Sequence, residues 1–238
     1  MTAANNSTDS IILLDNIPVH LDVPMVLERL KTHRANQRVE AVVRELIEVV
    51  MPVARPKVLY RVSQVTSADG KRLAVDGVEF SHHVPTLNFS QGERVFPYVA
   101  TCGLELEALK FPREMMKEYC LNIIKNVILT RSTQHYFQDH LKATYHLDEV
   151  SRIAPGEAMG TTVQQQKLFS LLGDVAGAIG VILSAHNMMV PEKSSSGIYF
   201  ETNIRIESCQ LCPNDCRTRR AAHDPELFQT FRKKPAVD

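Results

Sequence analysis

The sequence has few cysteines, no excess of one charge and no long apolar run, and each lack excludes a class of protein. Only 5 of the 238 residues are cysteine, fewer than a disulfide-stabilised scaffold needs. The formal net charge is +0, and this balance argues against a nucleic-acid partner. The longest apolar run, residues 175–183, is far shorter than the roughly 20 residues that a membrane-spanning helix requires. We therefore expect no nucleic acid and no membrane among its partners.

The N-terminal residues carry no recognisable export signal. Residues 1–10 are polar, and the apolar run at 11–14 lacks the basic flank and the length of a signal peptide. We expect a cytoplasmic chain with a disordered N-terminus over residues 1–10. In a reducing cytosol, clustered cysteines are better explained by metal or redox chemistry than by disulfides.

Periodicity in the first half predicts two helices followed by several strands. Apolar residues recur every three or four positions over 22–31 and 36–50. After Pro52 and Pro56, β-branched and aromatic side chains predict strands, with a turn at Asp76-Gly77. The expected strands of this region are 58–62, 72–75, 78–80 and 94–101.

The second half begins with a long predicted helix. Pro112 suits a helix start, and an apolar stripe over 116–128 indicates a buried helical face that can extend past Leu141. Pro155-Gly156 interrupts regular structure, a helix is expected at 163–172, and strands are expected at 180–183 and 198–206. Long helices mixed with non-alternating strands indicate a layered α+β or α/β domain.

The strongest local signal is a C-x2-C-x3-C spacing formed by Cys209, Cys212 and Cys216. A two-residue loop lets two sulfurs converge on one ion, and a third cysteine extends the cage. Zinc or an iron-sulfur cluster would suit these ligands, and the alternative is three thiols on a tail. The remaining ligand stays open among His223, Cys102, Cys120, a small molecule and a partner chain.

Two further segments have features of a binding site. Arg152 stands just before the bend at Pro155-Gly156, where glycine allows close backbone approach and arginine can grip a carboxylate. The segment 188–200 combines two methionines with a serine run that offers hydroxyl and backbone donors. Taken singly, each is explained as well by an ordinary loop.

Together these two segments resemble a known family. Arg152-x-Ala154-Pro155-Gly156, followed by Met189-x-Pro191-x-x-Ser194-x-Ser196-Gly197-x-Tyr199-Phe200, is similar in order and separation to two signatures of the activation domain of cobalamin-dependent methionine synthase. That module binds S-adenosylmethionine during repair of the corrinoid. The resemblance covers about 152–201 and implies an α+β fold, with an antiparallel or mixed sheet flanked by long helices and, here, a Cys-rich C-terminal tail. The expected divisions are 1–10, a helical and hairpin region at 11–94, an activation-domain-like core at 95–207, and the Cys-containing tail at 208–238.

The resemblance also implies a set of cofactor-binding residues. Arg152 would hold the carboxylate of S-adenosylmethionine, and the backbone at Ala154 and Gly156 would hold its polar groups. The family loop continues with tyrosine where Glu157 stands here, and a carboxylate there would attract the ligand's ammonium but repel its carboxylate. On the long helix, the family's glutamate corresponds to Gln134 or His135. The full expected set is Arg152, Ala154, Gly156, Glu157, Ser196, Gly197 and Tyr199.

The function implied is that of an accessory reactivation protein for a corrinoid-dependent methyltransferase. The chain would bind S-adenosylmethionine and support reductive methylation of oxidised cobalamin presented by a corrinoid protein, with no catalytic residue of its own. The departure at Glu157 motivates one alternative, a non-catalytic module that docks on a corrinoid protein. The cysteine trio motivates another, a metal-cluster electron carrier.

Overall fold

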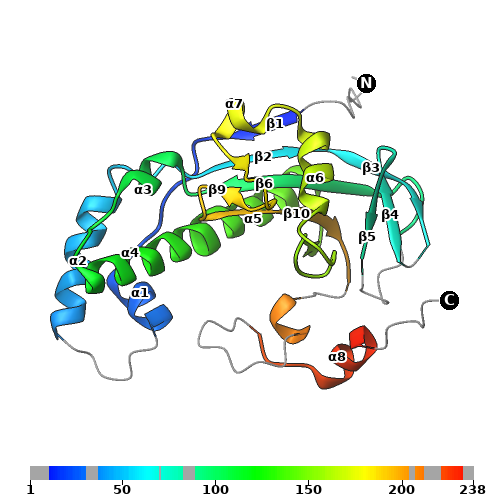
Figure 1. Cartoon of the computed structure of the whole chain (residues 1–238). Coiled ribbons are helices and arrows are strands. Elements are labelled where there is room, and N and C mark those ends of the chain that lie inside the picture. Colours follow the sequence, from blue (N-terminus) through cyan, green and yellow to red (C-terminus); the bar gives the residue numbers. More distant parts are fainter. Residues whose placement is uncertain are drawn as a thin grey trace.

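A computed structural model describes residues 11–30, 37–69, 71–82, 89–203, 207–211 and 221–232. Its helices flank one eight-stranded antiparallel sheet (Figure 1), which confirms the predicted α+β class. The strands of this sheet are β1 (Ile11–Leu14), β2 (Lys57–Arg61), β3 (Ser63–Ala68), β4 (Arg72–Val75), β5 (Val78–Ser81), β6 (Arg94–Thr101), β7 (Val150–Ile153) and β10 (Ser194–Glu201). A separate small ribbon pairs β8 (Ile182–Leu183) with β9 (Met189–Val190).

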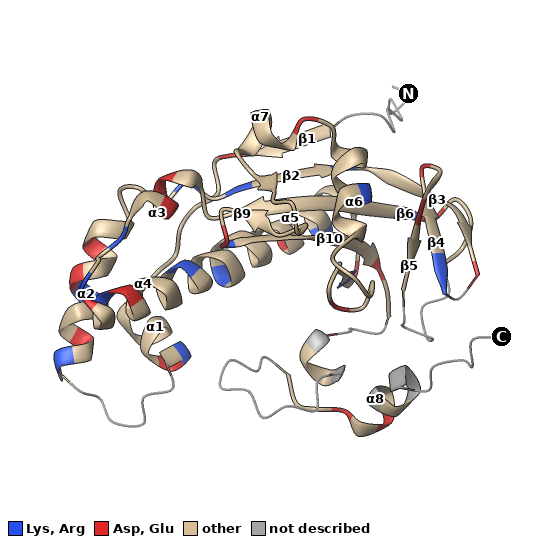
Figure 2. Cartoon of the chain, in the orientation of Figure 1, with Lys and Arg blue, Asp and Glu red and all other residues tan. Residues whose placement is uncertain are grey.

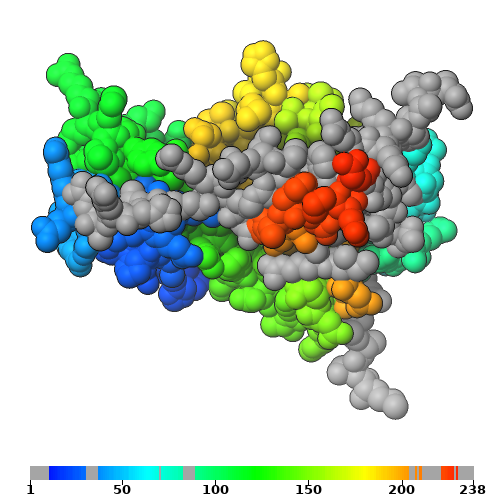
Figure 3. Space-filling view, turned by 90° about the horizontal axis from the view of Figure 1, so that it is seen from below, coloured from blue at the N-terminus to red at the C-terminus, as the bar shows by residue number. Residues whose placement is uncertain are grey.

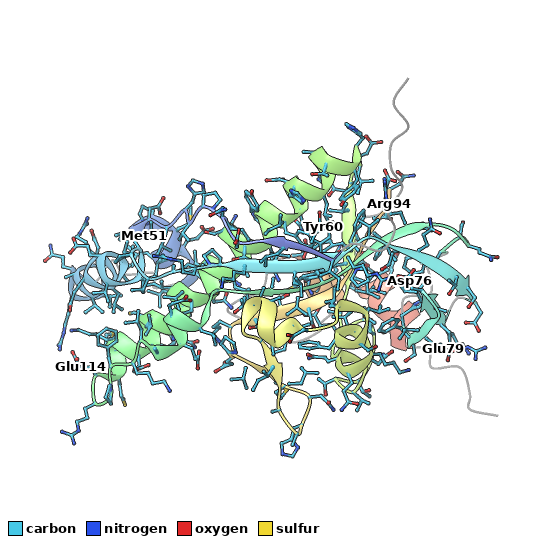
Figure 4. All side chains as sticks on the ribbon, turned by 90° about the horizontal axis from the view of Figure 1, so that it is seen from above. Met51, Tyr60, Asp76, Glu79, Arg94 and Glu114 are labelled. Carbon is cyan, nitrogen blue, oxygen red and sulfur yellow. The ribbon has the colours of Figure 1, made fainter. Side chains whose placement is uncertain are left out.

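The helices divide between the two faces and one end of the sheet. They are α1 (Val23–Leu30), α2 (Gln37–Val50), α3 (Leu104–Ala108), α4 (Met115–Val127), the π-helix η1 (Ile128–Gln134), α5 (His135–Tyr145), α6 (Gln164–Leu172), α7 (Val175–Ile179), the 3-10 helix η2 (Ser208–Leu211) and α8 (Pro225–Arg232). Figure 4 shows α5 on one face of the sheet and α6 and α7 on the other. Among the described residues, no helix has the length and apolar character needed to cross a membrane.

Strand β6 organises the sheet because it pairs with β2 and β3 along one edge and with β10 along the other. β10 in turn pairs with β7, so β10 lies inside the sheet and is buried along most of its length. Alternate side chains of these strands feed two separate cores. Phe200 and Ile198 face α6 and α7, whereas Tyr199 and Tyr98 pack on Phe137 of α5.

A third hydrophobic core holds α1, α2 and α4 together at the helical end of the molecule. Apolar residues of α1 and α2 pack against α4, as the periodicity of residues 22–31 and 36–50 predicts. Figure 2 shows acidic and basic positions interleaved along α2 and α4. One ion pair, Lys117 to Glu45 at 2.8 Å, joins these two helices. The outward faces are thus solvated while the inward faces are apolar.

The predicted long helix is present, but it begins at Met115 and not at Pro112, and its middle is π-helical. Regular α-helix runs over Met115–Val127, widens over Ile128–Gln134 and resumes until Tyr145. His146 then ends the helix in the left-handed conformation, with φ of 57°. π-helical turns place an extra residue in the helix and occur often at functional sites.

Several elements differ from the sequence-based expectations. The predicted strand at 198–206 begins earlier, at Ser194, and ends at Glu201; residues 204–206 lie outside the described ranges. The run 175–183 is not one element, because Gly180, with φ of 73°, ends α7 before β8 begins. The predicted disorder of residues 1–10 also falls outside the described residues.

Candidate functional site

The pairing of β7 with β10 brings the two sequence motifs together. Arg152 lies opposite Tyr199, and Ile153 lies opposite Ile198. Gly197 permits this approach, because a Cβ at that position would lie 2.5 Å from the carbonyl oxygen of Ile153. Arg152 therefore lies on strand β7, just before the bend.

The bend follows directly after β7. The carbonyl oxygen of Ala154 accepts hydrogen bonds from the backbone N–H groups of Glu157 and Met159, each at 3.1 Å. Gly156 adopts a φ of 79°, a conformation that side chains other than glycine rarely adopt. The turn thus carries the chain sharply away from the sheet and leaves Ala154, Pro155 and Glu157 around one cavity.

This cavity has a volume of ≈ 360 Å³, within the range of small-molecule sites. Of the seven expected cofactor-binding residues, it brings together Arg152, Ala154, Glu157 and Ser196. Gly156, Gly197 and Tyr199 lie beside it without lining it. The side chain of Tyr199 is buried against Tyr98 and Phe137, where it supports the wall from behind.

One wall of the cavity contains an ion pair. The guanidinium of Arg152 lies 3.4 Å from the carboxylate of Glu157, and their side chains are 15% and 37% exposed. Burial alone would lower the pKa of Arg152, but Tyr98, Glu157 and Tyr199 raise it above its ordinary value, so the cation persists. The group expected to hold a ligand carboxylate therefore already has a carboxylate partner.

A buried hydrogen-bond network supports the serine side of the cavity. The Oγ of Ser195 accepts from Gln134 Nε2 at 2.8 Å and lies 2.9 Å from the hydroxyl of Tyr98. Gln138 Nε2 donates to the Tyr199 hydroxyl at 3.2 Å. Burial, and then the neighbouring Tyr98, raise the pKa of Tyr199, so this phenol stays neutral. The network holds α5 and the π-helix at a fixed distance from β10.

The structure distinguishes the two candidates on the long helix. Gln134 is buried and lines the cavity, whereas His135 points to solvent. The π-helical segment contributes Leu129 and Thr130 to the same wall. The carboxamide of Gln134, at the end of this segment, donates to Ser195 on β10.

Among the cavity residues that sequence reasoning missed are Arg29 and Gln165. Arg29 comes from α1 and donates from its guanidinium to Asn126 Oδ1 at 3.3 Å. Gln165 comes from the first turn of α6. Neither belongs to a motif, and a helix surface offers many polar residues of this kind. The only available signal was the position of Gln165 on the apolar side of its helix.

The cysteine trio is only partly described. Cys209 of η2 lines the same cavity as Arg152, while Cys212 and Cys216 lie outside the described residues. No group of three or more His, Cys, Asp or Glu able to hold a metal occurs within the ranges that the structure describes. The zinc or iron-sulfur site thus stays a prediction. In Figure 3, α8, which packs on η2, lies on the same face of the molecule as α1.

The other proposed sulfur ligands are deep in the protein. Cys102 is buried, and its thiol donates to the carbonyl oxygen of Lys125 at 3.2 Å. Burial raises the pKa of Cys102 to about 12, which opposes the thiolate that a metal requires. Cys120 is buried in the core that joins α1, α2 and α4. The remaining candidate ligand, His223, has its Nδ1 3.0 Å from the carbonyl oxygen of Gln210, the residue that follows Cys209.

The chain has an α+β fold of the reactivation-domain type. The crystal structure of the MetH reactivation domain bound to AdoHcy is similar to it, with a TM-score of 0.53 over 82% of this chain and 79% of that one. The two sequences are 13% identical, and at that level the similarity shows the fold alone. No protein-family model matches the sequence, and no curated protein matches it.

Proposed function

We propose that this chain is an accessory reactivation protein that binds S-adenosylmethionine, and its product S-adenosylhomocysteine (AdoHcy), for a corrinoid-dependent methyltransferase. The observation that carries the proposal is the convergence of Arg152, Ala154 and Ser196, from two separate motifs, on one cavity. The fold supports it, because the similar MetH reactivation domain is described as bound to AdoHcy.

The side chains of the cavity suit such a ligand. AdoHcy has a zwitterionic amino-acid end and an uncharged nucleoside end. Arg29 and Arg152 provide cationic groups for the carboxylate of the first, and serine hydroxyls with the carboxamide of Gln165 suit the second. The volume of ≈ 360 Å³ accommodates a ligand that is partly enclosed and partly open to a partner.

The chain's own contribution is to hold the methyl donor in place. A cobalamin presented by a partner protein would supply the metal that accepts the methyl group. Arg29 and Arg152 would bind the amino-acid end, while the network of Gln134, Ser195 and Tyr98 keeps the wall rigid. Fixing the donor in this way converts an encounter of two molecules into a reaction of positioned groups.

Calorimetric titration of the purified protein with AdoHcy and with S-adenosylmethionine tests the proposal. We expect saturable binding of both, and Arg152→Ala should weaken it by about 1.5–3 kcal/mol through loss of a charged hydrogen bond. Arg44→Ala is the matched control, because Arg44 forms only an exposed ion pair with Glu40 on α2. Absence of binding at millimolar ligand would remove the methyl-donor role.

A second candidate is a docking module without a small ligand, and the ion pair of Arg152 with Glu157 favours it. In that case the Glu157 carboxylate permanently occupies the position beside Arg152 that the carboxylate of a ligand would need. The purified corrinoid-binding module of a methionine synthase would then bind this chain with the same affinity in the presence and absence of S-adenosylmethionine. Binding that requires the ligand would contradict this candidate.

A third candidate, an electron carrier, is favoured by the position of Cys209 on the cavity wall. A cluster held by Cys209, Cys212 and Cys216 would lie where it could pass an electron to a docked corrinoid. Anaerobic purification followed by iron, sulfide and zinc analysis tests this. Colourless, metal-free protein would contradict it.

A further inference from the structure

Helix α6 begins with three consecutive glutamines whose side chains have different environments. Gln164 is satisfied by the fold: its Oε1 accepts from the backbone N–H of Ser81 at 2.7 Å, and its Nε2 donates to the Ser81 carbonyl oxygen at 3.0 Å. Gln166 is exposed and donates to Asn187 Oδ1 at 2.7 Å. Gln165 is only 5% exposed, and its buried Oε1 has no hydrogen-bond partner.

An unsatisfied buried oxygen of this kind destabilises the fold. Burying a polar group without a partner costs about 1–3 kcal/mol, and the large majority of buried polar side-chain atoms in proteins have a partner. An apolar side chain of similar size would avoid that cost at Gln165. The fold of the free protein therefore gives no reason for a carboxamide here.

The place of Gln165 gives the reason. Its side chain forms part of the wall of the cavity that also contains Arg152, Ala154 and Ser196. The last torsion of a glutamine has a broad energy profile, so the carboxamide can turn its oxygen or its nitrogen to a ligand at small cost. A bound ligand would thus satisfy a group that the protein leaves unsatisfied.

The chemistry of a carboxamide selects the part of the ligand that it meets. It has one donor and one acceptor side by side, the pattern that glutamine uses to bind the N6 and N7 edge of adenine. Arg29 and Arg152 match the carboxylate of an adenosyl ligand, and the carboxamide of Gln134 already donates to Ser195, which leaves the carboxamide of Gln165 for the base. We propose that Gln165 hydrogen-bonds the adenine of the adenosyl ligand and so selects adenine over other bases. This inference rests on the proposed function.

The experiment measures the binding of two ligands to the wild type and to variants of Gln165 and Gln166. AdoHcy is titrated against its inosine analogue, in which an oxygen replaces the adenine amino group. We expect the wild-type protein to prefer AdoHcy by about 10-fold or more, the range for a paired carboxamide. Gln165→Leu should bind AdoHcy about 10-fold more weakly and lose most of the preference between the two ligands. Gln166→Leu is the matched control and should bind both ligands as the wild type does.

Thermal unfolding without ligand separates a binding role from a structural one. Gln165→Leu should unfold at the wild-type temperature or above it, because an unsatisfied oxygen is removed. Gln164→Leu should unfold at a lower temperature, because it leaves Ser81 without two partners. Gln165→Met, which keeps the length of the side chain, repeats the test if the leucine variant fails to fold.

The outcomes are distinct. If the wild type binds AdoHcy and Gln165→Leu keeps both the affinity and the base preference, the role of Gln165 is refuted while the proposed function stands. If Gln165→Leu unfolds at a lower temperature than the wild type but binds both ligands as the wild type does, the proposed role of Gln165 in binding is also refuted. If the wild type binds no adenosyl ligand at all, the proposed function fails and this inference fails with it.

Discussion

Replacing Glu157 with glutamine tests the main departure of this cavity from the methionine synthase motif. In the structure, the Glu157 carboxylate lies 3.4 Å from the guanidinium of Arg152. A ligand carboxylate that needs Arg152 must compete with that internal partner. Glu157→Gln removes the competing charge and keeps the size of the side chain, so AdoHcy should bind more tightly to this variant.

The magnitude follows from the distance and the exposure. For unit charges 3.4 Å apart, Coulomb's law gives about 1.2 kcal/mol in water and about 5 kcal/mol at an effective dielectric constant of about 20. Because more than a third of the Glu157 side chain is exposed, solvent screening favours the lower part of this range. We expect about 1–2 kcal/mol, which corresponds to a gain of about 5- to 30-fold in affinity.

Calorimetric titration of AdoHcy into the wild type, Glu157→Gln, Arg152→Ala and the double variant measures this effect. The gain should disappear in the double variant, because it depends on Arg152, and this dependence is the coupling that a double-mutant cycle isolates. A higher salt concentration should reduce the difference in AdoHcy affinity between the wild type and Glu157→Gln, because salt screens the charge of Glu157. Weaker binding by Glu157→Gln would refute the reasoning and would mean that Glu157 pairs with the ligand's ammonium.

Three further predictions concern other parts of the molecule. Gly197→Ala should lower the free energy of unfolding by about 1–3 kcal/mol in a denaturant titration, because the new Cβ would meet the Ile153 carbonyl oxygen; an unchanged midpoint would contradict the close approach of β7 and β10. Gln134→Ala should weaken AdoHcy binding by about 1 kcal/mol, whereas alanine at the exposed His135 should not; equal effects would contradict their placement. Cys102, with a pKa of about 12, stays protonated at pH 8 and should resist iodoacetamide until the protein is unfolded, as mass spectrometry of the labelled peptide can check; rapid labelling of the native protein would contradict its burial.

Much of the helical framework could be predicted from the sequence because the apolar periodicity is local. Residues 22–31 and 36–50 correspond closely to α1 and α2, whose apolar faces pack on α4. The short strand β7 could not be predicted in this way. Its four residues include a serine and an arginine, and its extended form depends on pairing with β10, some 45 residues later. The π-helical widening likewise has no local signature.

Some residues of the candidate site could be predicted from local sequence motifs, and others could not. Arg152 and Ser196 could be found because each belongs to a motif, and the resemblance links the two motifs in order. Arg29 and Gln165 reach the cavity only through tertiary packing, so no pattern near either residue identifies them. The ion pair of Arg152 with Glu157 also depends on the turn after Ala154, although the presence of a carboxylate there was visible in the sequence.

The most direct test of the central claim is a crystal structure of the protein grown with AdoHcy. We expect the ligand in the cavity between Ala154, Ser196 and the π-helical Gln134, with its carboxylate near Arg29 or Arg152 and its adenine at Gln165. Ligand density at another place on the molecule, with this cavity filled only by water, would contradict the account.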